Sequence, residues 1–249
     1  MMKPTVDMLF SRIRQARYCV AFTGAGISTL SGLPDFRGER GLYAGEPAFS
    51  RTAYGEKLFD IAAFEEDPAF FYRNAGAFIY PADEKIPSAV HRSLAEMEAQ
   101  GLIKAVITQN FDSLHQKAGS RRVIELHGSP RTHYCLRCSG IRMGYEEAAA
   151  LVKAGDMPRC PHCNRALKPA ITFFGEGLPL EARREAEAEA QQADVMLILG
   201  TSLSVYPAAD LPRTTLRNGG QLIIINNQET PLDANAALRF EDLETVFNR

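Results

Sequence analysis

The sequence lacks the features that would direct a chain into a membrane or out of the cell. Its 249 residues contain no run approaching the ~18 consecutive apolar residues of a membrane span. Its start has neither the apolar core nor the small-residue cleavage site of a secretory signal. Instead, Val6, Leu9, Phe10 and Ile13 follow helical spacing, which predicts an amphipathic helix. We therefore expect a cytoplasmic protein with no membrane partner.

Basic clusters, internal repeats and low-complexity tracts are also lacking. The net charge is -2 and the sequence pI is about 6.2, and lysine and arginine are scattered along the chain. No basic footprint for a phosphate backbone is present, so we expect no direct nucleic-acid binding. The hydrophobic content of 45% is typical of a globular protein. The length fits one large domain, alone or with a smaller insert.

Cysteine is scarce, and four of the five cysteines fall in two CxxC motifs. Cys135 and Cys138 form the first, Cys160 and Cys163 form the second, and 21 residues separate them. Each motif turns two thiolates in one direction, and two such turns complete a tetrahedral zinc site. Four thiolates leave no open position, so the metal is expected to be structural. The alternative is four buried or disulfide-paired cysteines; Cys19 is interpreted as a small core residue.

Four short apolar runs alternate with helical stretches. Continuous apolar strands separated by helices predict a parallel sheet covered on both faces, the α/β class. Helices are expected at 88–100 and 180–192. An excursion of short helices is expected from about residue 40 to 81, and a second excursion, from about 130 to 169, holds the cysteine pairs. The strands are expected at residues 18–23, 104–108, 193–199 and 221–225.

A glycine turn follows the first predicted strand. Gly24 and Gly26 lack side chains, as in the start of a dinucleotide fingerprint, where phosphate approaches a helix N-terminus. Ser28 is in place to cap that helix. Thr29 replaces the third glycine and no acidic partner ends a second strand, so a standard dehydrogenase fits poorly. A plain strand-to-helix turn is the alternative interpretation.

Further polar motifs follow the strands, at the edge of an open α/β sheet where ligands bind. Taken in order, GAGIS, GLPDFR, TQNFD, LHG, the paired CxxC, FFGE, GTSLSVYPAA and IINNQET resemble the sirtuin family of NAD-dependent protein-lysine deacylases. The resemblance implies a Rossmann-like domain made of 1–39, 82–129 and 170–249. It also implies a small domain made of a helical insert at 40–81 and a zinc ribbon at 130–169. NAD is then a co-substrate and zinc a structural metal.

The resemblance assigns residues to the NAD site. The GLPDFR loop would close over the phosphates, Gln109 would contact ribose near the reacting carbon, and Asn110 and Asp112 would serve the nicotinamide pocket and its water. The implied cofactor set is Gly24, Ala25, Gly26, Ser28, Thr29, Asp35, Phe36, Arg37, Gln109, Asn110, Asp112, Gly200, Thr201, Ser202 and Asn226.

By the same resemblance, His127 is the general base, with Asn110 and Asp112 beside it in catalysis. Imidazole titrates near neutral pH and can take a proton from a ribose hydroxyl. His91, His115 and His133 are interpreted as structural. The implied reaction frees the lysine and yields nicotinamide and acylated ADP-ribose from a site that excludes water.

Acylated-lysine proteins or peptides are the implied partners. The peptide would add as a strand between residues 175–178 and 204–206 and bind mostly through main chain. The implied substrate-binding set is Thr172, Phe174, Gly175, Glu176, Val205 and Tyr206.

The sequence departs from the usual family text at Leu33 and Phe111, where isoleucine is usual, and at Thr172, where valine is usual. We expect altered nicotinamide sensitivity from the first two. Family members that prefer succinyl or malonyl groups carry a tyrosine with arginine three residues later. Here Tyr72 is followed by Ala75, so acetyl or other uncharged acyl groups are expected.

Two other functions are consistent with parts of the sequence. An ADP-ribosyltransferase acting on proteins would share the first chemical step. A non-catalytic NAD-sensing or zinc-ribbon interaction module would need neither the histidine nor its neighbours, and the presence of His127, Asn110 and Asp112 together argues against it.

Overall fold

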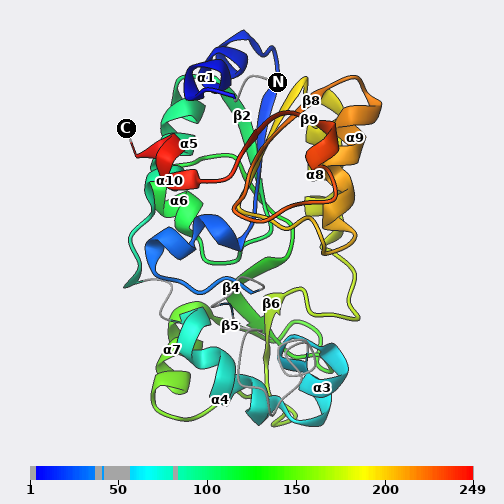
Figure 1. Cartoon of the computed structure of the whole chain (residues 1–249). Helices are drawn as coiled ribbons and strands as arrows, with labels where there is room; N and C mark the ends of the chain where they lie inside the picture. Colours follow the sequence, from blue (N-terminus) through cyan, green and yellow to red (C-terminus); the bar gives the residue numbers. More distant parts are fainter. Residues whose placement is uncertain (1–3, 37–40, 42–56, 81–83, 249) are drawn as a thin grey trace.

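The computed structural model describes residues 4–36, 41, 57–80 and 84–248, with the backbone alone for 75–78. Two regions are visible in Figure 1, a larger one built on a six-stranded sheet and a smaller one built on three strands. The helical insert predicted at 40–81 lies partly outside the described residues. The boundaries given above for the Rossmann-like domain and the small domain remain predictions.

The six-stranded sheet is parallel throughout and has the strand order β3-β2-β1-β7-β8-β9. The chain builds outward from β1 in one direction and then restarts at β7 on its other side. The order therefore reverses between β1 and β7, and ligands bind at such a switch point in doubly wound sheets. The strands are β1 (Cys19–Thr23), β2 (Ile103–Thr108), β3 (Val123–Glu125), β7 (Val195–Leu199), β8 (Gln221–Ile225) and β9 (Ala236–Phe240).

Helices cover both faces of this sheet because its central strands are apolar on both sides. Every residue of β1 and β7 is buried. One face packs against α1 (Val6–Gln15), α5 (Ala89–Ala99) and α10 (Leu243–Phe247). The other packs against α8 (Leu180–Gln192) and α9 (Leu211–Arg217). The predicted α/β fold is confirmed, as is the amphipathic first helix, which buries Val6, Leu9 and Ile13.

The small region has a three-stranded antiparallel sheet in the order β5-β4-β6. Its core is rich in rings, and Phe59 and Phe64 each make edge contacts with Phe71 and Phe173. Aromatic pairs of this kind add stability beyond the area they bury. The elements are α3 (Ile61–Glu66), α4 (Pro68–Ile79), β4 (Gly128–Tyr134), β5 (Arg142–Gly144), α7 (Tyr145–Lys153) and β6 (Lys168–Ile171).

The prediction that Ser28 caps a helix is wrong. The turn after β1 continues as two short 3-10 segments, Ala25–Ile27 and Thr29–Ser31, and Ser28 makes no side-chain cap. Its hydroxyl instead donates to Asp112 Oδ2 at 2.6 Å. Among the described helices, none has the length and apolar character to cross a membrane.

Candidate active site

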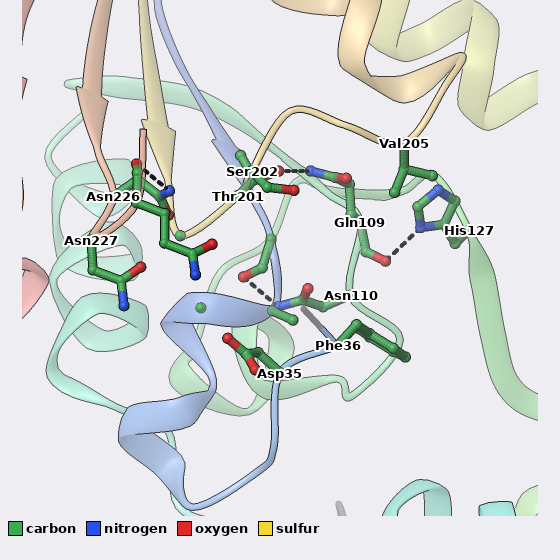
Figure 2. Close-up of a pocket in the computed structure, with 15 residues that line it drawn as sticks. Asp35, Phe36, Gln109, Asn110, His127, Thr201, Ser202, Val205, Asn226 and Asn227 are labelled. Carbon is green, nitrogen blue, oxygen red and sulfur yellow. Dashed lines mark hydrogen bonds between the residues drawn. The ribbon is translucent and has the colours of Figure 1, made fainter. Parts of the chain in front are cut away.

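A pocket lies at the carboxyl ends of β1, β2, β7 and β8, on the side of the sheet that faces the small region (Figures 1 and 2). In Figure 2, Gln109, His127 and Val205 gather on one side of it, and Asn226 and Asn227 lie on the other. Its described lining is Gly24, Ala25, Gly26, Asp35, Phe36, Gln109, Asn110, His127, Gly200, Thr201, Ser202, Val205, Asn226, Asn227 and Gln228.

The floor of the pocket is formed by two loops in direct backbone contact. Gly24 N–H donates to Leu199 O at 3.0 Å, and Gly26 N–H donates to Gly200 O at 2.9 Å. A Cβ on Gly26 would lie 2.8 Å from Gly200 Cα. Gly200 itself has a φ of +60°. The glycines are therefore required for one loop to pack on the other, whatever binds above them.

Amide and hydroxyl groups above this floor are held in fixed orientations. Gln109 Nε2 donates to Thr201 Oγ1 at 2.9 Å, which links the loop after β2 to the loop after β7. Asn110 Nδ2 lies 3.2 Å from both Gly24 O and Ser28 Oγ. The amide oxygen of each side chain stays available to accept a hydrogen bond. The side chains are thus set for a polar ligand before one binds.

Asp112 lies behind Asn110 and does not line the pocket. It accepts hydrogen bonds from Ser28 Oγ at 2.6 Å and from Leu114 N–H at 2.9 Å. Burial raises its pKa, and these hydrogen bonds oppose the rise. The Asp112 carboxylate acts on Asn110 through the shared Ser28 hydroxyl.

His127 follows β3 and presents one ring nitrogen to the pocket. Its Nδ1–H donates to Gln109 O at 2.8 Å, so Nε2 carries the free lone pair. Burial lowers the pKa of this histidine, and the bond to Gln109 partly opposes that shift. The imidazole is therefore neutral at neutral pH and able to accept a proton, as a general base must be.

Aromatic rings close the side of the pocket next to the small region. Phe36 contacts Phe59 and Phe111 at ring-centroid distances of 5.7 and 6.2 Å. Of the residues that depart from the usual family text, Phe111 belongs to this cluster, whereas Leu33 packs on Leu114. The rings form an apolar wall beside the polar groups.

The structure brings most of the predicted cofactor residues to one pocket. Ser28 and Asp112 stand in a second layer, and Thr29 is exposed, with its hydroxyl on Gly26 O at 2.9 Å. Arg37 lies outside the described residues. Sequence reasoning missed Asn227 and Gln228, although both follow β8 directly after Asn226, and their position behind a buried strand is the signal that could have found them.

The predicted substrate residues divide into two groups. Val205 lines the pocket, and Tyr206 is 59% exposed beside it. Thr172 N–H donates to His127 O at 2.8 Å, and Phe174 N–H donates to Phe59 O at 2.6 Å. Gly175 has a φ of +90°, and the Glu176 carboxylate accepts from Phe173 N–H at 2.7 Å. These four residues thus form a tightly bonded loop next to His127.

The four paired cysteines converge at the far end of β4 and β6. Their sulfur atoms all lie within 4.8 Å of one another, and Cys135 Sγ and Cys163 Sγ are 3.6 Å apart. A tetrahedral zinc ion with bonds of about 2.3 Å separates its sulfurs by about 3.8 Å, so the cluster fits zinc. The N–H groups of Arg137 and Cys138 point at Cys135 Sγ, which favours its thiolate. All five cysteines are free, so the disulfide alternative is wrong.

The histidines expected to be structural are buried and bonded. His133 Nε2 pairs with the Tyr80 hydroxyl at 2.7 Å. His91 Nδ1 accepts from Ser88 N–H and so completes the cap of α5. His115 Nε2 lies 2.9 Å from Thr23 Oγ1 behind the pocket floor. Cys19 is buried in β1, as expected.

Known proteins share this architecture. The Sir2 family model matches residues 24–207. An NAD-dependent protein deacetylase of Thermotoga maritima is 46% identical over 239 residues, 96% of this chain and 92% of that protein. A Sir2 structure with a deacetylated p53 peptide and 3'-O-acetyl ADP-ribose is 44% identical and has a TM-score of 0.88 over 97% of this chain and 94% of that one. Another, with a propionylated peptide, is 42% identical, with a TM-score of 0.84 over 96% and 93%.

Proposed function

The chain belongs to the Sir2 family, and we propose that it uses NAD to remove acetyl or other uncharged acyl groups from lysine side chains of proteins. The products are free lysine, nicotinamide and O-acyl-ADP-ribose. The observation that carries the proposal is His127, a neutral base with its tautomer fixed by Gln109 O, in a pocket at the switch point of a doubly wound sheet.

NAD would occupy the pocket along the two loops of its floor. It supplies an ADP-ribosyl group whose bond to nicotinamide is weakened by the positive charge of that ring. The floor glycines allow close approach of phosphate, and the hydroxyls of Thr201 and Ser202 are available to bind it. Gln109 and Asn110 would hold the ribose and the nicotinamide amide, with Asn226 at the adenosine end. Asp112 would orient Asn110 through Ser28.

His127 would accept a proton from a ribose hydroxyl at Nε2 while Nδ1–H stays on Gln109 O. The same Gln109 also bonds Thr201, so one residue would fix the base and the sugar side of the site. The rings of Phe36, Phe59 and Phe111 would keep water away from the reacting carbon. Water exclusion matters because hydrolysis of NAD competes with acyl transfer.

A preference for uncharged acyl groups follows from the charges of the site. No lysine or arginine occurs among the described lining residues, so none of them could pair with an acyl carboxylate. Tyr72 is buried in the small region and its hydroxyl donates to Leu167 O, away from the pocket. We therefore expect acetyl-lysine to be cleaved faster than succinyl-lysine in matched peptides.

The peptide would lie between the loop at 175–178 and the loop at 204–206, with the acyl-lysine entering beside Val205 and His127. Zinc on the four cysteines would hold the small region together and take no part in the chemistry. None of the five cysteines forms a disulfide, which supports a reducing, cytoplasmic location. The absence of direct nucleic-acid binding stays a prediction.

The test is mass spectrometry of an acetyl-lysine peptide incubated with the enzyme, with and without NAD, beside His127→Ala. We expect NAD-dependent deacetylation with one nicotinamide released per lysine freed, and a fall of about 10²–10⁴-fold in His127→Ala. A matched control is His91→Asn, which alters a structural histidine. Nicotinamide release with the acetyl group retained, and adenylate label left on protein, would point to ADP-ribosyl transfer instead.

A further inference from the structure

Lys168 is a charged residue with no exposed surface, at the start of β6. Its ammonium group lies 2.8 Å from Glu176 Oε2, 2.5 Å from Ile171 O and 3.3 Å from Pro169 O. Its three protons therefore have three oxygen acceptors. Burial lowers the pKa of this lysine, and Glu176 opposes that shift. A buried ammonium costs several kcal/mol unless it is paired in this way, so the pair needs an explanation.

Glu176 uses the same carboxylate to close a turn. Its Oε2 accepts from Phe173 N–H at 2.7 Å, and its own N–H donates to Phe173 O at 3.0 Å. The Phe173 ring lies 4.0 Å below the lysine ammonium, in cation–π contact. A Cβ on Gly175, at a φ of +90°, would lie 2.9 Å from Ile61. Residues 173–176 thus form one rigid turn around the Lys168 ammonium.

This turn is bonded by main chain to both sides of the site. Phe174 N–H donates to Phe59 O at 2.6 Å, and Phe174 O accepts from Ile61 N–H at 3.1 Å. On the other side, Thr172 N–H donates to His127 O at 2.8 Å. The pair at Lys168 therefore holds the segment that joins the small region to the base. None of residues 168–176 lines the NAD pocket.

We propose that Lys168 and Glu176 are positioning residues that fix the 173–176 turn as one edge of the acyl-peptide slot. Glu176 acts by holding the turn from within, and its carboxylate does not contact the substrate. The inference rests on the proposed function, because the slot is the one that the deacylase would use. The proposal predicts different effects on the two substrates of the enzyme. The affinity for peptide depends on the Lys168–Glu176 pair, whereas the affinity for NAD does not.

The test compares Lys168→Met, Glu176→Gln and the double variant. The matched control removes Arg183 and Glu187, an exposed pair on α8, in the same way. Kd for an acetyl-lysine peptide is measured without NAD, and KM is measured for each substrate. Hydrogen bonds to charged groups contribute about 1.5–3 kcal/mol, so we expect each single variant to weaken peptide binding about tenfold or more. KM for NAD and the control variant should stay unchanged.

The most decisive comparison is between the double variant and the two single variants, because it measures the energetic coupling between Lys168 and Glu176 in peptide binding. Either single change already breaks the ion pair. The Kd of the double variant for the peptide should therefore be no higher than that of the single variant with the higher Kd. Faster exchange of the Phe173 and Phe174 amides should accompany the loss, with zinc content unchanged. Glu176→Gln keeps an oxygen for Phe173 N–H and serves as the test if Lys168→Met does not fold.

Additive losses in the double variant would overturn the inference, because they would place Glu176 on the substrate. An equal rise in KM for NAD would overturn it as well. Wild-type enzyme that binds the peptide but never deacylates it would instead count against the proposed function, and the binding and exchange measurements would still decide the role of the pair.

Discussion

The two regions of this chain achieve stability by different means. The central strands of the large sheet bury every side chain, most of them aliphatic, beneath helices on both faces. The small region covers three strands with rings and gathers four cysteine sulfurs at its edge. A large apolar core can sustain itself, whereas a small one commonly needs a metal or a cross-link. We therefore expect the large region to hold its fold without a metal and the small region to need zinc on its four cysteines.

Removal of zinc should produce the largest difference in stability between the two regions. Structural zinc contributes about 10–16 kcal/mol to the folding of small zinc domains. A chelator, or Cys160→Ser, should expose the amides of β4, β6 and α7 to exchange while β1, β7 and β8 stay protected. Deacylation should be lost as well, since Thr172 bonds His127.

Hydrogen exchange followed by mass spectrometry measures both regions in one experiment. Cys19→Ala serves as the control, because that residue lies in β1 and away from the cluster. Simultaneous loss of protection in both regions would contradict their independence.

The large region should be most sensitive where its backbone packs closely. In Gly200→Ala the new Cβ would lie 2.6 Å from Ile27 N at a φ of +60°. Left-handed strain and overpacking together should lower the free energy of unfolding by about 2–4 kcal/mol and weaken NAD binding.

Gly219→Ala is a matched control, because its φ is +80° and no atom lies within 4 Å of the added Cβ. We expect this change to cost only about 1–2 kcal/mol in urea unfolding. Equal losses in both variants would mean that conformational strain, and not packing between the two loops, decides the effect.

Acid should destabilise the large region through its buried histidines. Burial lowers the pKa of His91 from 6.5 to about 4, and that of His115 well below 6.5. Both stay neutral in the folded state but gain a proton on unfolding, so stability is lost as pH falls below 6.5. Each pKa unit corresponds to about 1.4 kcal/mol.

His91→Asn should reduce this dependence on pH. The measurement is amide exchange in β1 and β2, compared between pH 7 and pH 5 in wild type and variant. These strands belong to the large region, so the result does not depend on the zinc cluster of the small region. A variant that keeps the full wild-type loss would show that other groups cause it.

The smallest expected effect is a change of the catalytic rate with pH. In the proposed reaction the neutral form of His127 is the active one, and burial lowers the pKa of this histidine below 6.5. The rate should therefore rise with pH through that lowered pKa, with a midpoint below pH 6.5. The dependence of kcat/KM on pH, which reports the pKa of the free enzyme, gives the midpoint, and a midpoint above 6.5 would mean that a different group limits the rate.

Strands and helices followed from local patterns. Residues 221–225 and 180–192 form a strand and a helix with the predicted bounds, and the strand expected at 193–199 begins two residues later. Apolar runs and helix stops are local properties, so they could be taken from the sequence. The cap assigned to Ser28 failed because its hydroxyl bonds Asp112, a residue 84 positions away.

The motifs also identified most pocket residues, but not how each one acts. Gln109 bonds both Thr201 and, through its carbonyl, His127. Asn227 and Gln228 were missed because only Asn226 was taken from the polar run that follows β8, although all three residues line the pocket.

The α/β class and the CxxC pairs of the zinc site could be predicted from the amino-acid sequence, because they depend on residue type and spacing along the chain. The choice of His127 as the base came from the resemblance of the LHG motif to the family, because residue type and spacing do not distinguish it from the other histidines. Three contacts became apparent only from the folded chain: the glycine turn packs on Gly200, Asp112 reaches Asn110 through the Ser28 hydroxyl, and Lys168 pairs with Glu176 inside a turn. Those contacts join residues from separate strands and loops, and their geometry is fixed only when the sheet and the small region have packed together.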